Sequence, residues 1–146
     1  MASDSELPQV KPVPYRHVPT KQGRYKELPS LPTRSLLLAP SGDGGSTFMQ
    51  WAILDGYRGA FARVYISSPT FHLDKATWDP IKAFVHGAEL GVPRSEVCFF
   101  DTWKAEKQEE ILDSAEAVTE WCREKKRPGF HTLICVDDFI YQVDPS

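Results

Sequence analysis

Residues 35–47 read SLLLAPSGDGGST, an apolar run that passes directly into a glycine-rich turn. The run from Ser35 to Ala39 is short, continuous and ended by Pro40, which favours a buried strand. Apolar residues then recur at helical spacing over residues 46–58, and Gly59 suits the end of a helix. This stretch therefore predicts a strand, a glycine-rich turn and a helix in direct succession.

The rest of the chain alternates between strand-like and helix-like segments. Short runs rich in β-branched and aromatic residues predict strands at 62–67, 97–100 and 131–136. Apolar residues at helical spacing predict helices over 76–90, with Pro80 placed in its first turn, and over 104–126, with a possible break at Asp113–Ser114. This alternation predicts an α/β fold with a mainly parallel sheet of three or four strands and flanking helices.

Length and composition are those of one globular domain. The chain has 146 residues, of which 41% are hydrophobic and 25% charged, so neither a disordered nor a fibrous protein fits. A net charge of −3 gives no general reason to expect nucleic-acid binding. No apolar run is long enough to span a bilayer, and no secretory signal follows Met1. We therefore expect no membrane association.

The spacing of the three cysteines bears on the compartment. Cys98, Cys122 and Cys135 match neither a metal-binding knuckle nor a dense disulfide framework. Reduced thiols are typical of proteins in a reducing environment. The sequence therefore predicts an intracellular protein, with no indication of the compartment.

Residues 1–34 differ from the rest in composition. They hold half of the 12 prolines, and they carry six basic against three acidic residues. Proline removes a backbone donor and restrains its neighbour, so we expect an extended basic arm without regular helix. Two interpretations stay open: the arm packs on its own domain or is solvated, or it binds double-stranded DNA weakly through phosphates, without sequence preference.

The glycine-rich turn resembles a phosphate-binding loop. That loop has the pattern G-x-x-x-x-G-K-[ST], and residues 39–46 read APSGDGGS over the same eight positions. Gly44 matches the second glycine and Ser46 the hydroxyl that ligates Mg²⁺, whereas Gly45 stands where the lysine would reach the phosphates. The predicted phosphate-binding residues are Ser41, Gly42, Asp43, Gly44, Gly45, Ser46 and Thr47.

A second motif lies about 90 residues downstream. The apolar run Leu133–Val136 ends in Asp137 and Asp138, as in a Walker B strand. Because parallel strands present their carboxyl ends to one crevice, we expect these carboxylates beside the glycine-rich turn. In that arrangement Asp137 lies near Mg²⁺ and Asp138 orients the attacking water.

Together these motifs give the chain a resemblance to the P-loop ATPases that package genomes into the capsids of large DNA viruses, and to their FtsK/HerA relatives. The resemblance covers residues 35–139 and is carried by the segments SLLLAPSGDGGST, RVYISSP and VDDF. It implies ATP with Mg²⁺ as ligands and a multimeric motor that moves double-stranded DNA. It also implies Ser46 and Asp137 as metal ligands and Asp138 as the catalytic acid.

Three features of the sequence depart from that family and bear on activity. Gly45 removes the phosphate-binding lysine, and Asp43 adds a carboxylate inside the anion cradle. The chain also ends at Ser146, before the later strands and arginine-finger positions of such motors. We therefore expect a partial domain that binds ATP with weak or lost hydrolysis. The alternative is a non-enzymatic interaction module on the same α/β scaffold.

Overall fold

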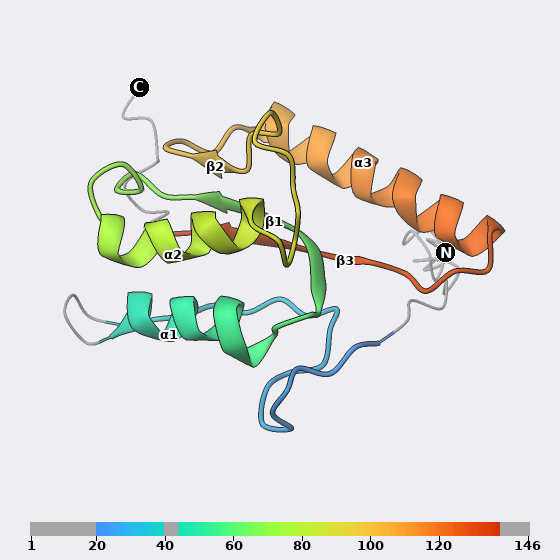
Figure 1. Cartoon of the computed structure of the whole chain (residues 1–146), viewed down its shortest axis with the longest axis horizontal. Helices are drawn as coiled ribbons and strands as arrows, with labels where there is room; N and C mark the ends of the chain where they lie inside the picture. The colour runs from blue at the N-terminus through green and yellow to red at the C-terminus, as the bar shows by residue number, and fades with distance from the viewer. Residues whose placement is uncertain (1–19, 40–43, 138–146) are drawn as a thin grey trace, which may run out of the picture.

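A computed structural model of the chain describes residues 20–39 and 44–137. Its elements are α1 (Gly45–Trp51), a π-helical turn η2 (Ala52–Gly56), β1 (Phe61–Ser67), α2 (Lys75–His86), β2 (Phe99–Phe100), α3 (Ala105–Glu124) and β3 (His131–Val136). The strands form one sheet in the order β2-β1-β3, and both pairings are parallel. The predicted α/β class with a parallel sheet is therefore confirmed (Figure 1).

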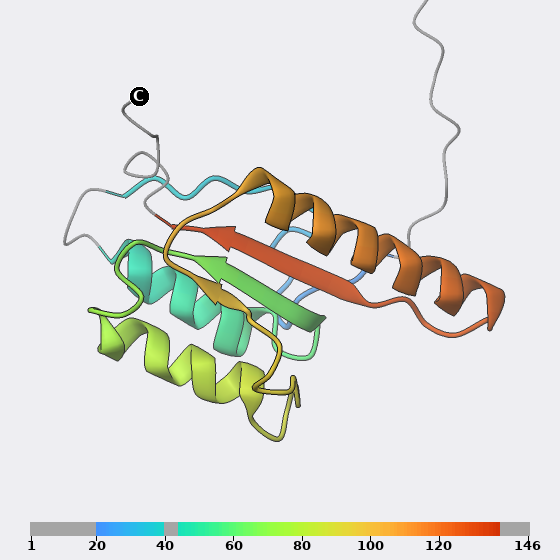
Figure 2. The same ribbon diagram turned by 90° about the horizontal axis from the view of Figure 1, so that it is seen from above.

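The sheet lies between two layers of helices. Seen from above in Figure 2, α1 and α2 cover one face of the sheet and α3 covers the other. Central strand β1 is buried on both faces, and Val64 and Ile66 have no exposed surface. Strands that are covered on both sides favour continuous apolar runs, which explains why β1 and β3 show no polar alternation.

Helix α2 supplies three fully buried residues of the core. Trp78, Ile81 and Val85 are at most 1% exposed and share one face at helical spacing. The helix begins after Asp74, whose Oδ1 accepts a hydrogen bond from the Thr77 backbone N–H at 3.2 Å. This capping bond satisfies one of the first-turn amides, which have no acceptor within the helix.

Pro80 lies inside α2 rather than in its first turn, so its predicted position is wrong. A proline inside a helix leaves the carbonyl four residues earlier without its N–H partner, and here that carbonyl belongs to Ala76. Gln50 of α1 supplies the replacement, because its Nε2 donates to the Ala76 oxygen at 3.2 Å. The proline is thereby compatible with the helix, and the same bond joins α2 to α1.

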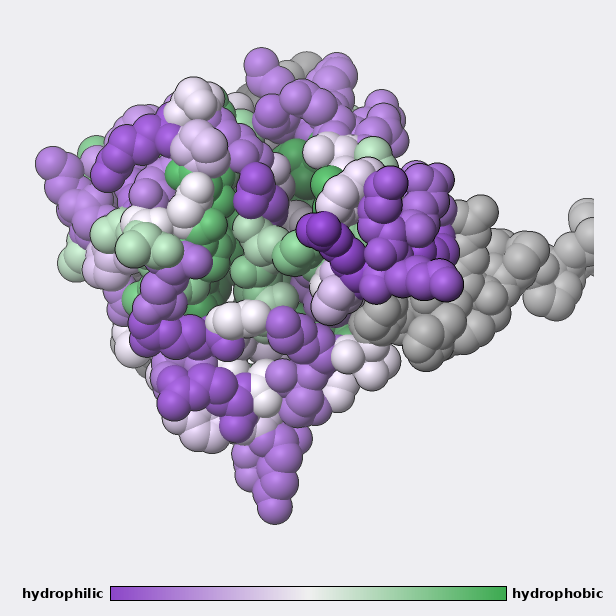
Figure 3. Space-filling model, turned by 45° about the vertical axis from the view of Figure 1, so that its right-hand side comes forward, coloured by the Kyte–Doolittle hydropathy of each residue, from purple (hydrophilic) through white to green (hydrophobic). Residues whose placement is uncertain are grey.

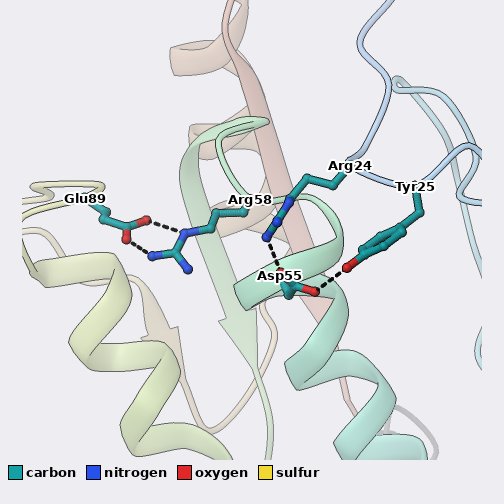
Figure 4. Close-up of polar contacts among 5 residues, drawn as sticks. All are labelled: Arg24, Tyr25, Asp55, Arg58 and Glu89. Atoms are coloured by element: carbon teal, nitrogen blue, oxygen red, sulfur yellow. Dashed lines mark hydrogen bonds and ion pairs between the residues drawn. The ribbon is translucent and has the colours of Figure 1, made fainter.

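The described part of the basic arm, residues 20–34, packs on its own domain. Lys21 and Leu31 form an antiparallel bridge, and Leu31 is 6% exposed. Figure 4 shows Arg24 and Tyr25 both directed at Asp55 of η2, with which Arg24 forms an ion pair and Tyr25 a hydrogen bond. This part of the arm therefore packs on its own domain, DNA binding by the arm stays a prediction, and residues 1–19 lie outside the described residues.

The backbones of the arm and η2 approach closely at two glycines. The Arg24 backbone N–H donates to the Gly56 oxygen at 2.8 Å, and a Cβ on Gly23 would lie 2.8 Å from that same oxygen. A side chain at residue 23 would therefore displace the arm. On the other side of η2, Arg58 forms an ion pair with Glu89 in the turn after α2 (Figure 4).

The predicted strand at 35–39 is wrong. Residues 33–39 have no strand pairing, and Leu36 and Leu38 are 83% and 82% exposed. Within the described chain no backbone hydrogen bond joins this segment to β3. A short apolar run becomes a buried strand only beside a partner strand, and β3 pairs here with β1.

Other boundaries differ less from their predictions. Helix α2 stops at His86 instead of residue 90, because Gly87 takes an extended conformation. Helix α3 runs through Asp113–Ser114 without a break. Strand β2 has two residues where four were expected.

Two further expectations concern cysteines and membranes. Cys98, Cys122 and Cys135 are free thiols, as predicted. None of the helices in residues 20–39 and 44–137 combines the length and the apolar character that a bilayer crossing requires.

Candidate nucleotide site

Helix α1 begins at the glycine-rich turn. Its first residue is Gly45, and Gly44 before it has a left-handed backbone with φ of 85°. A left-handed residue at the helix start favours glycine, which has no Cβ to oppose that conformation. The first intrahelical bond runs from the Phe48 N–H to the Gly44 oxygen at 2.9 Å. The amides of Gly45, Ser46 and Thr47 precede it and can face a ligand.

Asp137 follows the last residue of β3 and is held by the end of β1. Its backbone N–H donates to the Ser67 oxygen at 2.8 Å, which continues the parallel ladder by one residue. Its Oδ2 accepts a hydrogen bond from the Ser68 hydroxyl at 2.9 Å. Ser68 is fully buried and also lies 3.1 Å from the Thr70 hydroxyl. This network fixes the position of the carboxylate.

One contact brings the two motifs to the same end of the molecule. The Cys135 Sγ of β3 lies 3.0 Å from the Met49 Sδ of α1. Helix α1 and strand β3 run in opposite directions in both ribbon views (Figures 1 and 2). Ser46 lies one turn before Met49, about 4.5 Å along the helix, and Asp137 lies two residues after Cys135, about 6.6 Å along the strand. Both are therefore displaced from that contact toward the same edge of the sheet.

The Cys135 thiol is a packing group in this arrangement. Burial raises its pKa to about 12, and the negative charge of Asp137 adds to that shift. A thiol with such a pKa stays protonated at neutral pH and is a poor nucleophile. Cys135 is therefore not a candidate nucleophile at this edge of the sheet.

Ser46 and Asp137 fit a magnesium ion whose other ligands are phosphate oxygens of a bound molecule and water. Ser46 is exposed and Asp137 is half-buried, so both can be reached from solvent. The described part of the chain holds no cluster of three or more metal-ligating side chains. Mg²⁺ does not require one, because it is commonly held by one or two carboxylates together with phosphate oxygens and water.

The remaining predicted site residues divide into two groups. Gly44, Gly45, Ser46 and Thr47 lie together at the start of α1. Ser41, Gly42, Asp43 and Asp138 lie outside the described residues. Ser68 was not predicted as a site residue. Two serines that end an apolar strand, at the edge where the other motifs meet, are the signal that could have revealed it.

Ser68→Ala is expected to lower the free energy of unfolding by about 1–2 kcal/mol, because the half-buried Asp137 carboxylate loses the hydrogen bond from the Ser68 hydroxyl. Urea denaturation would measure the loss. In an Asp137→Asn background the same substitution should cost less, since a hydrogen bond to a neutral amide is weaker than one to a charge. Equal losses in both backgrounds would contradict a coupling between Ser68 and the Asp137 charge.

No protein-family model, no curated protein and no solved structure matches this chain.

Proposed function

We propose that this domain binds ATP with Mg²⁺ at the edge of the sheet where α1 begins and β3 ends. The phosphates would meet the backbone amides of the first turn of α1, and Mg²⁺ would lie between the Ser46 hydroxyl and the Asp137 carboxylate. The observation that carries the proposal is the contact between Cys135 and Met49, which aligns these two groups at one edge. The glycine-rich turn before α1 supports it.

Gly45 sets the expected chemistry. Without a lysine at this position, no ammonium group from the loop neutralises the β- and γ-phosphates. Binding then depends on backbone amides and on Mg²⁺, and the charge that develops during phosphoryl transfer is poorly stabilised. The proposed activity is therefore nucleotide binding, with hydrolysis weak or absent and Asp138 as the water-orienting acid if any hydrolysis occurs.

Gly45→Lys is expected to strengthen binding of Mg·ATP on the order of tenfold, because it returns a charge to the phosphates. A fluorescent-nucleotide titration would measure the change. A Cβ at this position would lie 3.1 Å from the Ala39 Cβ, so any lysine variant also shifts the loop slightly.

Gly45→Met is the matched control, since it adds the same Cβ and a comparable stem without a charge. Binding by Gly45→Met should stay at or below that of the parent. If Gly45→Lys binds no better than Gly45→Met, the loop is not a phosphate cradle, and an interaction module without nucleotide becomes the better account.

A further inference from the structure

The end of α3 carries exposed cations beside exposed aromatic rings. Lys125, Lys126 and Arg127 are exposed, and among the described residues none of them forms an ion pair. Trp121 and Phe130, on either side of them, are 45% and 56% exposed. In Figure 3 this end of the molecule is turned toward the viewer, and its described part is mainly hydrophilic. We call these five residues the α3-end surface.

Lys126 has a backbone conformation that disfavours a side chain. Its φ is 53°, and within residues 20–39 and 44–137 it is the sole residue other than glycine with a positive φ. Lys126 ends α3 in a Schellman motif. Its N–H donates to the Arg123 oxygen at 3.2 Å, and the Arg127 N–H donates to the Cys122 oxygen at 2.8 Å. Glycine is the favoured residue at this position of such a motif. A lysine here destabilises the helix end relative to glycine, so folding alone does not explain it.

Arg127 and Trp121 form an ordered pair. The Arg127 guanidinium carbon lies 5.2 Å from the centre of the Trp121 ring, within the range of a cation–π contact. The pair places a positive charge and an exposed aromatic surface side by side. Lys125 and Lys126 lie in the turn between them along the chain.

We propose that the α3-end surface binds a single-stranded nucleic acid. Cations at a helix C-terminus are also favoured by the helix dipole, and that effect accounts for Lys125. It accounts neither for a lysine at the left-handed position nor for two exposed aromatic rings. Cations that attract phosphates beside rings that stack on bases are the combination with which proteins bind single strands. The proposal is independent of the nucleotide site, which lies at the start of α1.

Lys126→Gly separates binding from stability in the full chain. We expect it to raise the Tm by about 2–4 °C, because glycine tolerates the left-handed conformation. We expect it to weaken binding of a fluorescein-labelled oligothymidylate, measured by anisotropy. The slope of the logarithm of the binding constant against the logarithm of the salt concentration should become shallower by about 0.7. Trp121→Ala should weaken the same binding roughly fivefold or more through lost stacking. The basic arm is present in every variant, so a difference between two variants reports on the substituted residue.

Two controls complete the experiment. Lys126→Arg keeps the charge and should bind like the parent, whereas Arg94→Gln removes an exposed charge elsewhere and should change binding less than Lys126→Gly does. The proposal is overturned if Lys126→Gly binds like the parent, or if Arg94→Gln weakens binding equally. It is also overturned if Lys126→Gly and Trp121→Ala weaken binding of a duplex of equal length as much as they weaken binding of the oligothymidylate, or if the parent binds anionic phosphatidylserine vesicles and not the oligonucleotide.

Discussion

Trp78→Ala is expected to lower the free energy of unfolding by about 3–5 kcal/mol, because it opens a large cavity in the main core. The Trp78 side chain is 1% exposed and belongs to the core cluster that joins α2 to the sheet. Since domains are stable by about 5–15 kcal/mol in total, this loss would remove a large share of the stability. Guanidinium denaturation followed by circular dichroism would measure it.

Trp78→Phe is the matched control for this substitution. The indole Nε1 of Trp78 is buried and, among the described residues, has no hydrogen-bond partner. Phenylalanine keeps most of the ring contacts and removes that unsatisfied donor, so its cost should be much smaller. If the two variants lose similar stability, α2 is not anchored to the sheet by the Trp78 ring, and the core described above is wrong.

The second large effect concerns the paired carboxylates. Asp137→Asn should weaken Mg²⁺-dependent nucleotide binding on the order of tenfold or more, because it removes the charge nearest the proposed ion. The asparagine oxygen can still accept the Ser68 hydrogen bond, so the variant should stay folded. Asp138→Asn should leave binding nearly intact and abolish any residual hydrolysis, because it removes the proposed water-orienting group. Nucleotide titration at varied Mg²⁺ and a phosphate-release assay would measure the two effects.

The two variants also serve as controls for each other. Unfolding of Asp137→Asn would show that this carboxylate is structural. Unchanged Mg·ATP binding by Asp137→Asn would show that the magnesium ligand lies elsewhere, even if the glycine-rich turn binds phosphates.

Elements with strong local signals could be predicted from the sequence. Strands β1 and β3 have β-branched residues between clear breakers, and α2 repeats its apolar residues at helical spacing. Their parallel arrangement follows from the alternation of strands and helices along the chain.

The segment at 35–39 shows where local signals are insufficient. Its three leucines resemble a buried strand, yet burial depends on a neighbouring strand that no local pattern specifies. The same limit applies to the site. The sequence predicts that Ser46 and Asp137 lie at one edge, but the hydrogen bond that holds Asp137 comes from Ser68, and only the register between β1 and β3 brings those two residues together.

The most direct test of the proposed function is a thermal-shift titration of the full chain with Mg·ATP, with ATP plus a chelator as the comparison. A bound ligand at 100 times its dissociation constant stabilises a protein by about 2.7 kcal/mol. We predict a saturable rise in Tm with Mg·ATP that is much reduced when Mg²⁺ is removed. An unchanged Tm at the highest soluble concentration of Mg·ATP would contradict a nucleotide site between α1 and β3.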